Sequence, residues 1–131
     1  MARRSNRQVD LKFSTNTQEF RDGIADMNSD LKLLRKQLKL NESEMKANGE
    51  SVEGYQKRQE LLQEQLQASA KKIEYTEKCL AEAKELYGEN SKKVKEWEGR
   101  LATAQTELNK TQAEINKTND RLEEFANEAN P

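Results

Sequence analysis

The sequence predicts an all-α protein of long helices with heptad repeats, and three observations support this class. Apolar residues recur every seven positions between Phe20 and Phe125, and Gln59 is the one polar residue in the column that begins at Ile24. Only 33% of the residues are hydrophobic and 36% are charged, which is too polar for the core of a compact domain. The single proline is Pro131. A period of 3.5 residues sustained over this length predicts coiled-coil packing.

The composition also argues against several functions. The 23 basic and 24 acidic residues are interspersed and leave a net charge of −1, so no field attracts nucleic acid or a membrane surface. No run approaches the ~18 apolar residues of a membrane span. Cys79 is alone, and the chain has no histidine, the usual general base and metal ligand. We therefore expect no enzyme activity, no catalytic residues, no cofactor and no metal.

The first fifteen residues predict a basic arm followed by a short β-strand. Val9, Leu11 and Phe13 alternate with polar residues, which is a strand pattern over about residues 8–14. Such a short strand needs a partner. Two possibilities stay open: the segment folds back on the first helix, or it pairs with the same segment of another chain.

The first helix is expected over residues 16–48. Thr15, Asn16 and Thr17 offer side chains that can cap its N-terminus. Within it, Leu33 and Leu40 widen the apolar face beyond the stripe that one neighbouring helix would cover. This width favours a trimer, or docking of the helix onto the rest of the chain.

Two glycine-containing segments predict joints between helices. Gly49 is suited to end a helix, and Ser51 can cap the next one. The same pattern returns at Gly88, Asn90 and Ser91. The predicted second unit, residues 51–128, thus contains helices over 52–87 and 92–127.

Two arrangements of these helices remain open. The heptad phase continues through both joints, which favours one continuous coiled coil. Side-chain size favours an antiparallel helical hairpin, because folding back at Gly88 sets large residues against small ones, as close packing requires. Leu80 then faces Trp97, while Lys72 approaches Glu107 and Arg58 approaches Glu114. The residues expected to form the self-association seam are Ile24, Leu31, Leu34, Leu38, Leu62, Leu66, Ile73, Leu80, Val94, Trp97, Leu101, Leu108, Ile115 and Leu122.

Several segments resemble the opening of tail tape measure proteins from long-tailed phages and prophages of Gram-positive bacteria. They are Val9–Phe13, Asn16–Phe20, Gly23–Ile24, Met27–Lys32 with Leu34, Ser43–Gly49 and Tyr87–Lys92. Family members are many hundreds of residues long, so the chain is interpreted as an N-terminal fragment or a shortened gene product.

The resemblance implies a virion structural protein whose helical length sets the length of the tail. The implied partners are copies of the chain itself, with a trimer favoured, the tail tube protein and tail assembly chaperones. The implied location is the tail lumen of the virion, and the host bacterial cytoplasm during assembly. The alternative that the sequence leaves open is a cytosolic coiled-coil adaptor that tethers other proteins.

Overall fold

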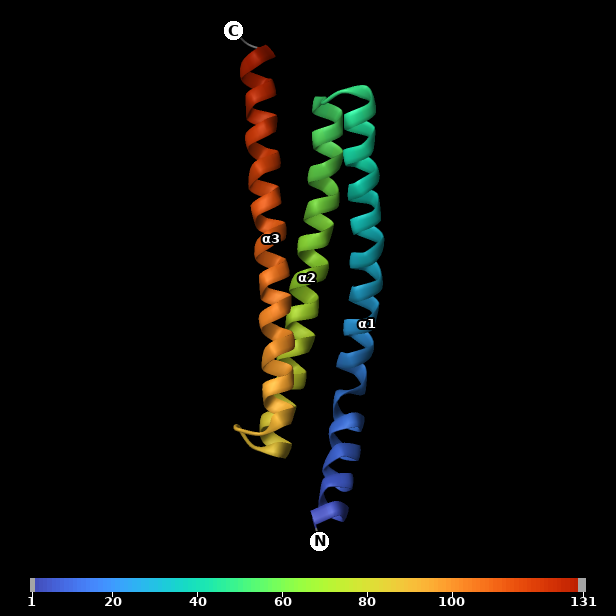
Figure 1. The fold of residues 1–131 in the computed structure, drawn as a ribbon, viewed down its shortest axis with the longest axis vertical. Helices are drawn as coiled ribbons and strands as arrows, with labels where there is room; N and C mark the ends of the chain where they lie inside the picture. Colours follow the sequence, from blue (N-terminus) through green and yellow to red (C-terminus); the bar gives the residue numbers. More distant parts are fainter. Residues whose placement is uncertain (1, 130–131) are drawn as a thin grey trace.

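The computed structural model describes residues 2–129 of the chain, and the side chains of residues 6–128. It contains three helices: α1 (Ala2–Asn48), α2 (Val52–Tyr87) and α3 (Lys92–Ala129). They lie side by side, each antiparallel to the next, with α2 in the middle (Figure 1). The longest, α1, spans about 70 Å at 1.5 Å per residue. The prediction of an all-α protein is confirmed, since these residues include no strand.

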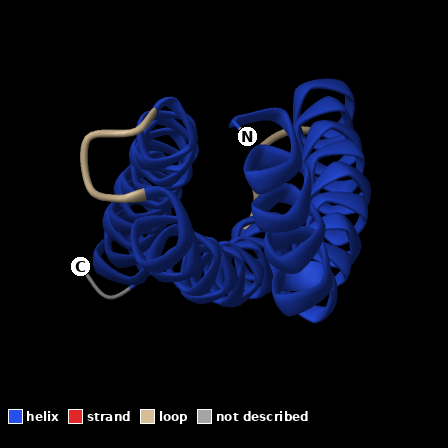
Figure 2. Ribbon diagram, turned by 90° about the horizontal axis from the view of Figure 1, so that it is seen from below, coloured by secondary structure: helices blue, strands red, loops and turns tan. Residues whose placement is uncertain are grey.

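The three helices follow an arc instead of closing into a triangle (Figure 2). Within the described residues, α1 contacts α2 and α2 contacts α3, whereas no Cα atom of α1 lies within 8 Å of one in α3. Only side chains bridge the two outer helices. On the concave side of the arc, side chains of all three helices line cavities that together form a groove.

The predicted arm and strand are wrong, because residues 2–15 are the first turns of α1. Residue 1 lies outside the described part. Val9 and Phe13 are four residues apart, so they share one helical face. Phe13 is 4% exposed, whereas Leu11 points the other way and is 70% exposed. The alternation that suggested a strand is thus compatible with a helix whose inner face is covered by α2 and α3.

The expected helix start near residue 16 is also wrong. Thr17 does not cap a helix; its hydroxyl donates a hydrogen bond to the carbonyl oxygen of Phe13, one turn earlier, at 2.7 Å. Its Oγ1 also accepts a hydrogen bond from Nε of Arg21 at 3.1 Å. These bonds satisfy the hydroxyl of a buried threonine in the middle of a helix, so the residues that could have capped a new helix leave α1 unbroken.

Both turns use the residues that the sequence singled out. Gly49 and Gly88 have φ angles of +91°, a conformation that side chains disfavour. Ser51 accepts a hydrogen bond from the backbone N–H of Gly54 at 2.9 Å, and Ser91 accepts one from Val94 at 3.2 Å. Two serine caps therefore begin α2 and α3.

Helix α2 is buried on two sides because each outer helix covers one of them. One set of its buried side chains recurs every seven residues, and a second set lies next to it along the helix. The first set is Tyr55, Leu62, Ser69, Thr76 and Ala83, and the second is Leu61, Ala68 and Cys79.

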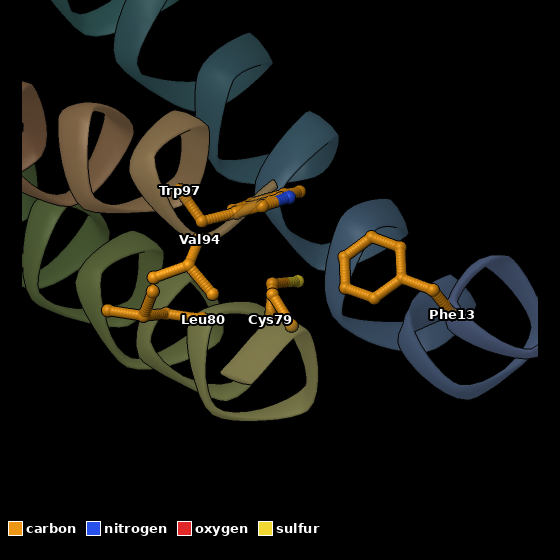
Figure 3. Packing of buried hydrophobic residues seen from close by; sticks show 6 residues of the cluster. Phe13, Cys79, Leu80, Val94 and Trp97 are labelled. Carbon is orange, nitrogen blue, oxygen red and sulfur yellow. The ribbon is translucent and has the colours of Figure 1, made fainter. Parts of the chain in front are cut away.

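The largest buried cluster joins all three helices near the α2–α3 turn (Figure 3). Phe13 from α1 meets Trp97 from α3, with ring centroids 6.1 Å apart. Cys79 and Leu80 from α2 lie in the same cluster. The predicted proximity of Leu80 and Trp97 agrees with this packing.

Two glycines provide a matched test of the packing between α1 and α2. A Cβ atom at Gly99 would meet no atom within 4 Å, but one at Gly23 would lie 2.7 Å from the ring of Tyr75. We expect Gly99→Ala to raise the free energy of unfolding by about 1 kcal/mol, the usual gain in a helix interior. Gly23→Ala should fail to give this gain, because the ring must move. Urea denaturation followed by circular dichroism measures both, and equal gains would contradict the packing.

Candidate interaction surface

The residues expected to form the self-association seam lie between helices of the same chain. None is fully exposed; seven are buried and the others are half-buried. The buried ones are Leu31, Leu34, Leu62, Leu80, Val94, Trp97 and Ile115, and the half-buried ones are Ile24, Leu38, Leu66, Ile73, Leu101, Leu108 and Leu122. Packing within one chain thus uses most of the apolar surface that was assigned to contacts between chains.

Two predicted ion pairs between α2 and α3 are confirmed. Nζ of Lys72 lies 3.6 Å from Oε2 of Glu107, and Nη2 of Arg58 lies 3.1 Å from Oε2 of Glu114. A third pair, Arg35 with Glu107 at 3.7 Å, connects α1 to α3 across the groove. Partly exposed pairs contribute little to stability, so their main effect is to favour this register.

Two cavities occupy the concave groove. One, of about 450 Å³, lies beside Arg35, Leu62 and Glu107, and the other, of about 530 Å³, lies beside Ile24 and Trp97. Both are lined by all three helices and mix apolar with charged side chains.

The apolar side chains that the chain leaves uncovered lie mainly on α1. Leu11, Leu33 and Leu40 are 70%, 57% and 58% exposed. At 100° per residue these three positions fall within about 40° of one another around the helix. They form one stripe, which we call the leucine stripe; the exposed Asp22 and Asp26 interrupt it between Leu11 and Leu33.

Opposite charges flank the leucine stripe. Lys36 and Lys32 lie on one side of it, while Asp30 lies on the other, next to Glu64 of α2. All four side chains are exposed. The α1 surface therefore has a basic flank, an apolar centre and an acidic flank, an order that can be complementary to itself.

A cluster of polar and aromatic groups fastens α3 to the α1–α2 turn. Glu50 accepts hydrogen bonds from the hydroxyl of Tyr55 at 2.8 Å and from Arg121 at 2.5 Å. These two hydrogen bonds hold the pKa of the Glu50 carboxyl below its usual value, and the bond from Tyr55 has the larger effect. The Tyr55 and Phe125 rings lie 5.8 Å apart beside the Arg121 guanidinium.

The opposite end has a related arrangement. The hydroxyl of Tyr87 donates to Asp10, and the Tyr87 ring lies 5.7 Å from that of Phe13. Burial, followed by the hydrogen bond to Asp10, raises the pKa of Tyr87 to about 12. The ammonium group of Lys93 lies 5.0 Å from the centre of the Phe13 ring.

Sequence reasoning missed Phe13 as a core residue, and with it the second buried face of α2. The available signal was two pairs of adjacent apolar residues, Leu61 with Leu62 and Cys79 with Leu80, all four of which are buried in the structure. A helix that buries two neighbouring residues in successive turns contacts two partners. This pattern indicates two partners for α2, but Leu33 and Leu34 of α1 are adjacent in the same way, so it does not show which helix lies at the centre.

The chain has no histidine. Among residues 2–129, no group of three or more cysteine or acidic side chains could hold a metal ion. Nor is any helix in this part of the chain long and apolar enough to cross a bilayer.

Comparisons with protein-family models, with curated proteins and with solved structures find no match for this chain. Its class is therefore defined by the fold and the surfaces alone. It is an elongated protein of three helices, each antiparallel to its neighbour, with an exposed leucine stripe on one outer helix.

The buried thiol of Cys79 predicts a dependence of stability on alkaline pH. Cys79 is 0% exposed, and burial raises its pKa from 9.0 to about 11. The folded protein thus holds this proton more tightly than the unfolded chain does. The contribution is fully present below pH 9 and is lost as the pH rises through 11.

We expect the free energy of unfolding to fall by up to about 2 kcal/mol between pH 9 and 11 through this thiol. Urea titrations at a series of pH values measure the loss. Cys79→Ala is the control, because it lacks the titrating group and retains only the contribution of lysines and tyrosines. The same pH dependence in both proteins would contradict the assignment.

Proposed function

We propose that this chain is a non-enzymatic structural protein that assembles through coiled-coil contacts of its helices. More specifically, we propose the N-terminal part of a phage tail tape measure protein. The observation that carries the proposal is the exposed leucine stripe: Leu11, Leu33 and Leu40 are all more than half exposed, whereas Val52, the other large apolar side chain exposed among the described residues, is 37% exposed. An exposed apolar stripe on a rigid helix is typical of a contact with another protein.

The flanking charges support contacts between copies of the chain that point the same way. In a parallel arrangement, the basic flank with Lys36 meets the acidic flank with Asp30 of the neighbour. In an antiparallel arrangement, like charges would meet. Parallel copies, including a parallel trimer, fit a protein that lies along the lumen of a tail.

In the proposed role the helices act in the virion tail and assemble first in the host bacterial cytoplasm. The tail tube protein would polymerise around the assembled helices, and tail assembly chaperones would bind the leucine stripe beforehand. Helical length sets tail length at about 1.5 Å per residue. The segments that resemble tape measure proteins, such as Val9–Phe13, support this assignment through their sequence.

The leucine stripe is tested by the double variant Leu33→Ser, Leu40→Ser. We expect self-association at high protein concentration to weaken at least tenfold, because two apolar contacts per chain are lost. Light scattering combined with size-exclusion chromatography gives the mass of the assembly. Val52→Ser is the control, since Val52 is 37% exposed but lies outside the stripe. Unchanged association of the double variant would reject the stripe as the contact.

The tape measure role is tested in the full-length protein of a phage. Removal of one heptad from α1 should shorten the tails by about 10 Å, and removal of several should shorten them in proportion. Electron microscopy of the virions gives the lengths. Tails of unchanged length would reject the role for this region.

A cytosolic adaptor is the second candidate, and the concave groove is the observation that favours it. A segment of a partner protein could lie beside Arg35 and Glu107, where charged side chains line the groove. Neighbouring genes for tail tube and chaperone proteins would favour the tape measure. A stable complex with an unrelated host protein that covers the groove would favour the adaptor.

A further inference from the structure

The heptad phase passes through the α2–α3 turn without a break. Tyr87 ends α2, and Val94, seven residues later, is the first buried residue of α3. A turn between two antiparallel helices does not need this spacing, because each helix can start its own phase. A single helix that continues through the turn does need it.

The turn itself makes few contacts that would oppose straightening. No atom lies within 4 Å of a Cβ at Gly88, and Glu89 and Asn90 are exposed. The local backbone bonds run from the Gly88 N–H to the Lys84 carbonyl and from the Ser91 N–H to the Gly88 carbonyl. The first of these already joins residues four apart, as in an α-helix, so a continuous helix would keep it and replace only the second with its own hydrogen bond.

The contacts between α2 and α3 are nearly symmetric about this turn. The midpoint in sequence is residue 88 for Gln65 with Thr111, and residue 90 for Tyr55 with Phe125. Two straightened chains placed antiparallel about this point would therefore repeat the same contacts between copies. Domain exchange of this kind has a low cost because only the local contacts of the turn are lost.

We infer that two copies of the chain exchange α3 and form an extended dimer, in which α2 and α3 of each copy are one continuous helix. The partner is a second copy, and the surfaces are those that α2 and α3 bury within the monomer. The side-chain contacts of α1 with α3, such as Phe13 with Trp97, form with the exchanged helix instead.

The exchanged dimer gains a layer that the monomer lacks. In the monomer, Leu80 lies near Trp97 in the core cluster, and Ala83 and Val94 belong to the same cluster. Extending this register by one layer sets Tyr87 of each copy opposite Asn90 of the other. A polar asparagine in a central layer favours a single register, as in other helical assemblies.

Concentration decides between the two forms. Gly88, Asn90 and Ser91 are weak helix formers, so a straightened turn is disfavoured in a single chain. The exchanged form therefore accumulates as the protein concentration rises, by mass action.

The variant Gly88→Ala tests the inference directly. Alanine is strained at a φ of +91° but favours a helix, so it weakens the turn and supports the continuous helix. We expect the dimer dissociation constant to fall at least tenfold. The maximum dimension from small-angle X-ray scattering should rise from about 70 Å to about 120 Å, the length of a helix over residues 52–129.

Gly99→Ala is the matched control, because the same change in the middle of α3 should leave the dissociation constant unchanged. Insertion of three glycines after Glu89 lengthens the turn and breaks the phase, and this variant, made together with Leu33→Ser and Leu40→Ser, should remain monomeric. Circular dichroism verifies that each variant keeps its helix content. A monomeric Gly88→Ala protein at millimolar concentration would overturn the inference.

Cross-linking separates exchange from association through the leucine stripe. In a Cys79→Ala background, the double variant Lys72→Cys, Glu107→Cys is treated with a short bis-maleimide, since these two positions meet between α2 and α3. Exchange predicts covalent dimers on a denaturing gel at high concentration. A dimer in solution that yields only links within one chain would overturn exchange. The cross-link joins α2 to α3, so Leu33→Ser and Leu40→Ser on α1 leave it unaffected. Its result is therefore independent of the proposed role in a phage tail.

Discussion

The whole arrangement depends on the burial of α2 on two sides. An amphipathic helix normally covers one apolar stripe against one neighbour. Here Leu61 and Leu62 are both buried, as are Cys79 and Leu80, so α2 needs a helix on each flank. Because α1 and α3 satisfy α2 separately, they have little reason to pack against each other. The open arc and its groove follow from this one constraint.

The ends of the molecule limit how far the helices can slide. At one end Arg121 and Tyr55 hold α3 at Glu50, and at the other Tyr87 holds Asp10 and packs on Phe13. Interhelical ion pairs lie between these ends. Each ion pair is weak by itself, but a sliding of α3 by one turn would lose the contact of Phe125 with Tyr55 at one end and that of Trp97 with Phe13 at the other.

The surfaces left over define what the protein can do. The heptad-spaced apolar side chains of the seam are buried or half-buried within the chain, yet α1 keeps exposed leucines between flanks of opposite charge. Such a face is compatible with the proposed association of parallel copies. The unbroken heptad phase at Gly88 is compatible with the proposed exchange of α3 between two copies. Both modes use rigid helices as building elements, which is the property that a structural role in a tail or a scaffold requires.

The sequence by itself determined the all-α class and the joints at Gly49 and Gly88, and it predicted the pairing of Lys72 with Glu107 for the hairpin, one of the two arrangements that it left open. These features depend on local chemistry and on side-chain periodicity, which can be read along one chain. It failed before residue 16, where the alternation of Val9, Leu11 and Phe13 is compatible with both a strand and a helix.

Only the tertiary structure decided that case, because Tyr87 and Trp97 cover Phe13 and leave Leu11 in solvent. It also decided which helix lies at the centre, and which leucines of α1 remain exposed. Leu31 and Leu33 are equally apolar, and a period of seven cannot show which of them a neighbour covers. The answer depends on where α2 and α3 lie in space, and contacts between distant segments set that position.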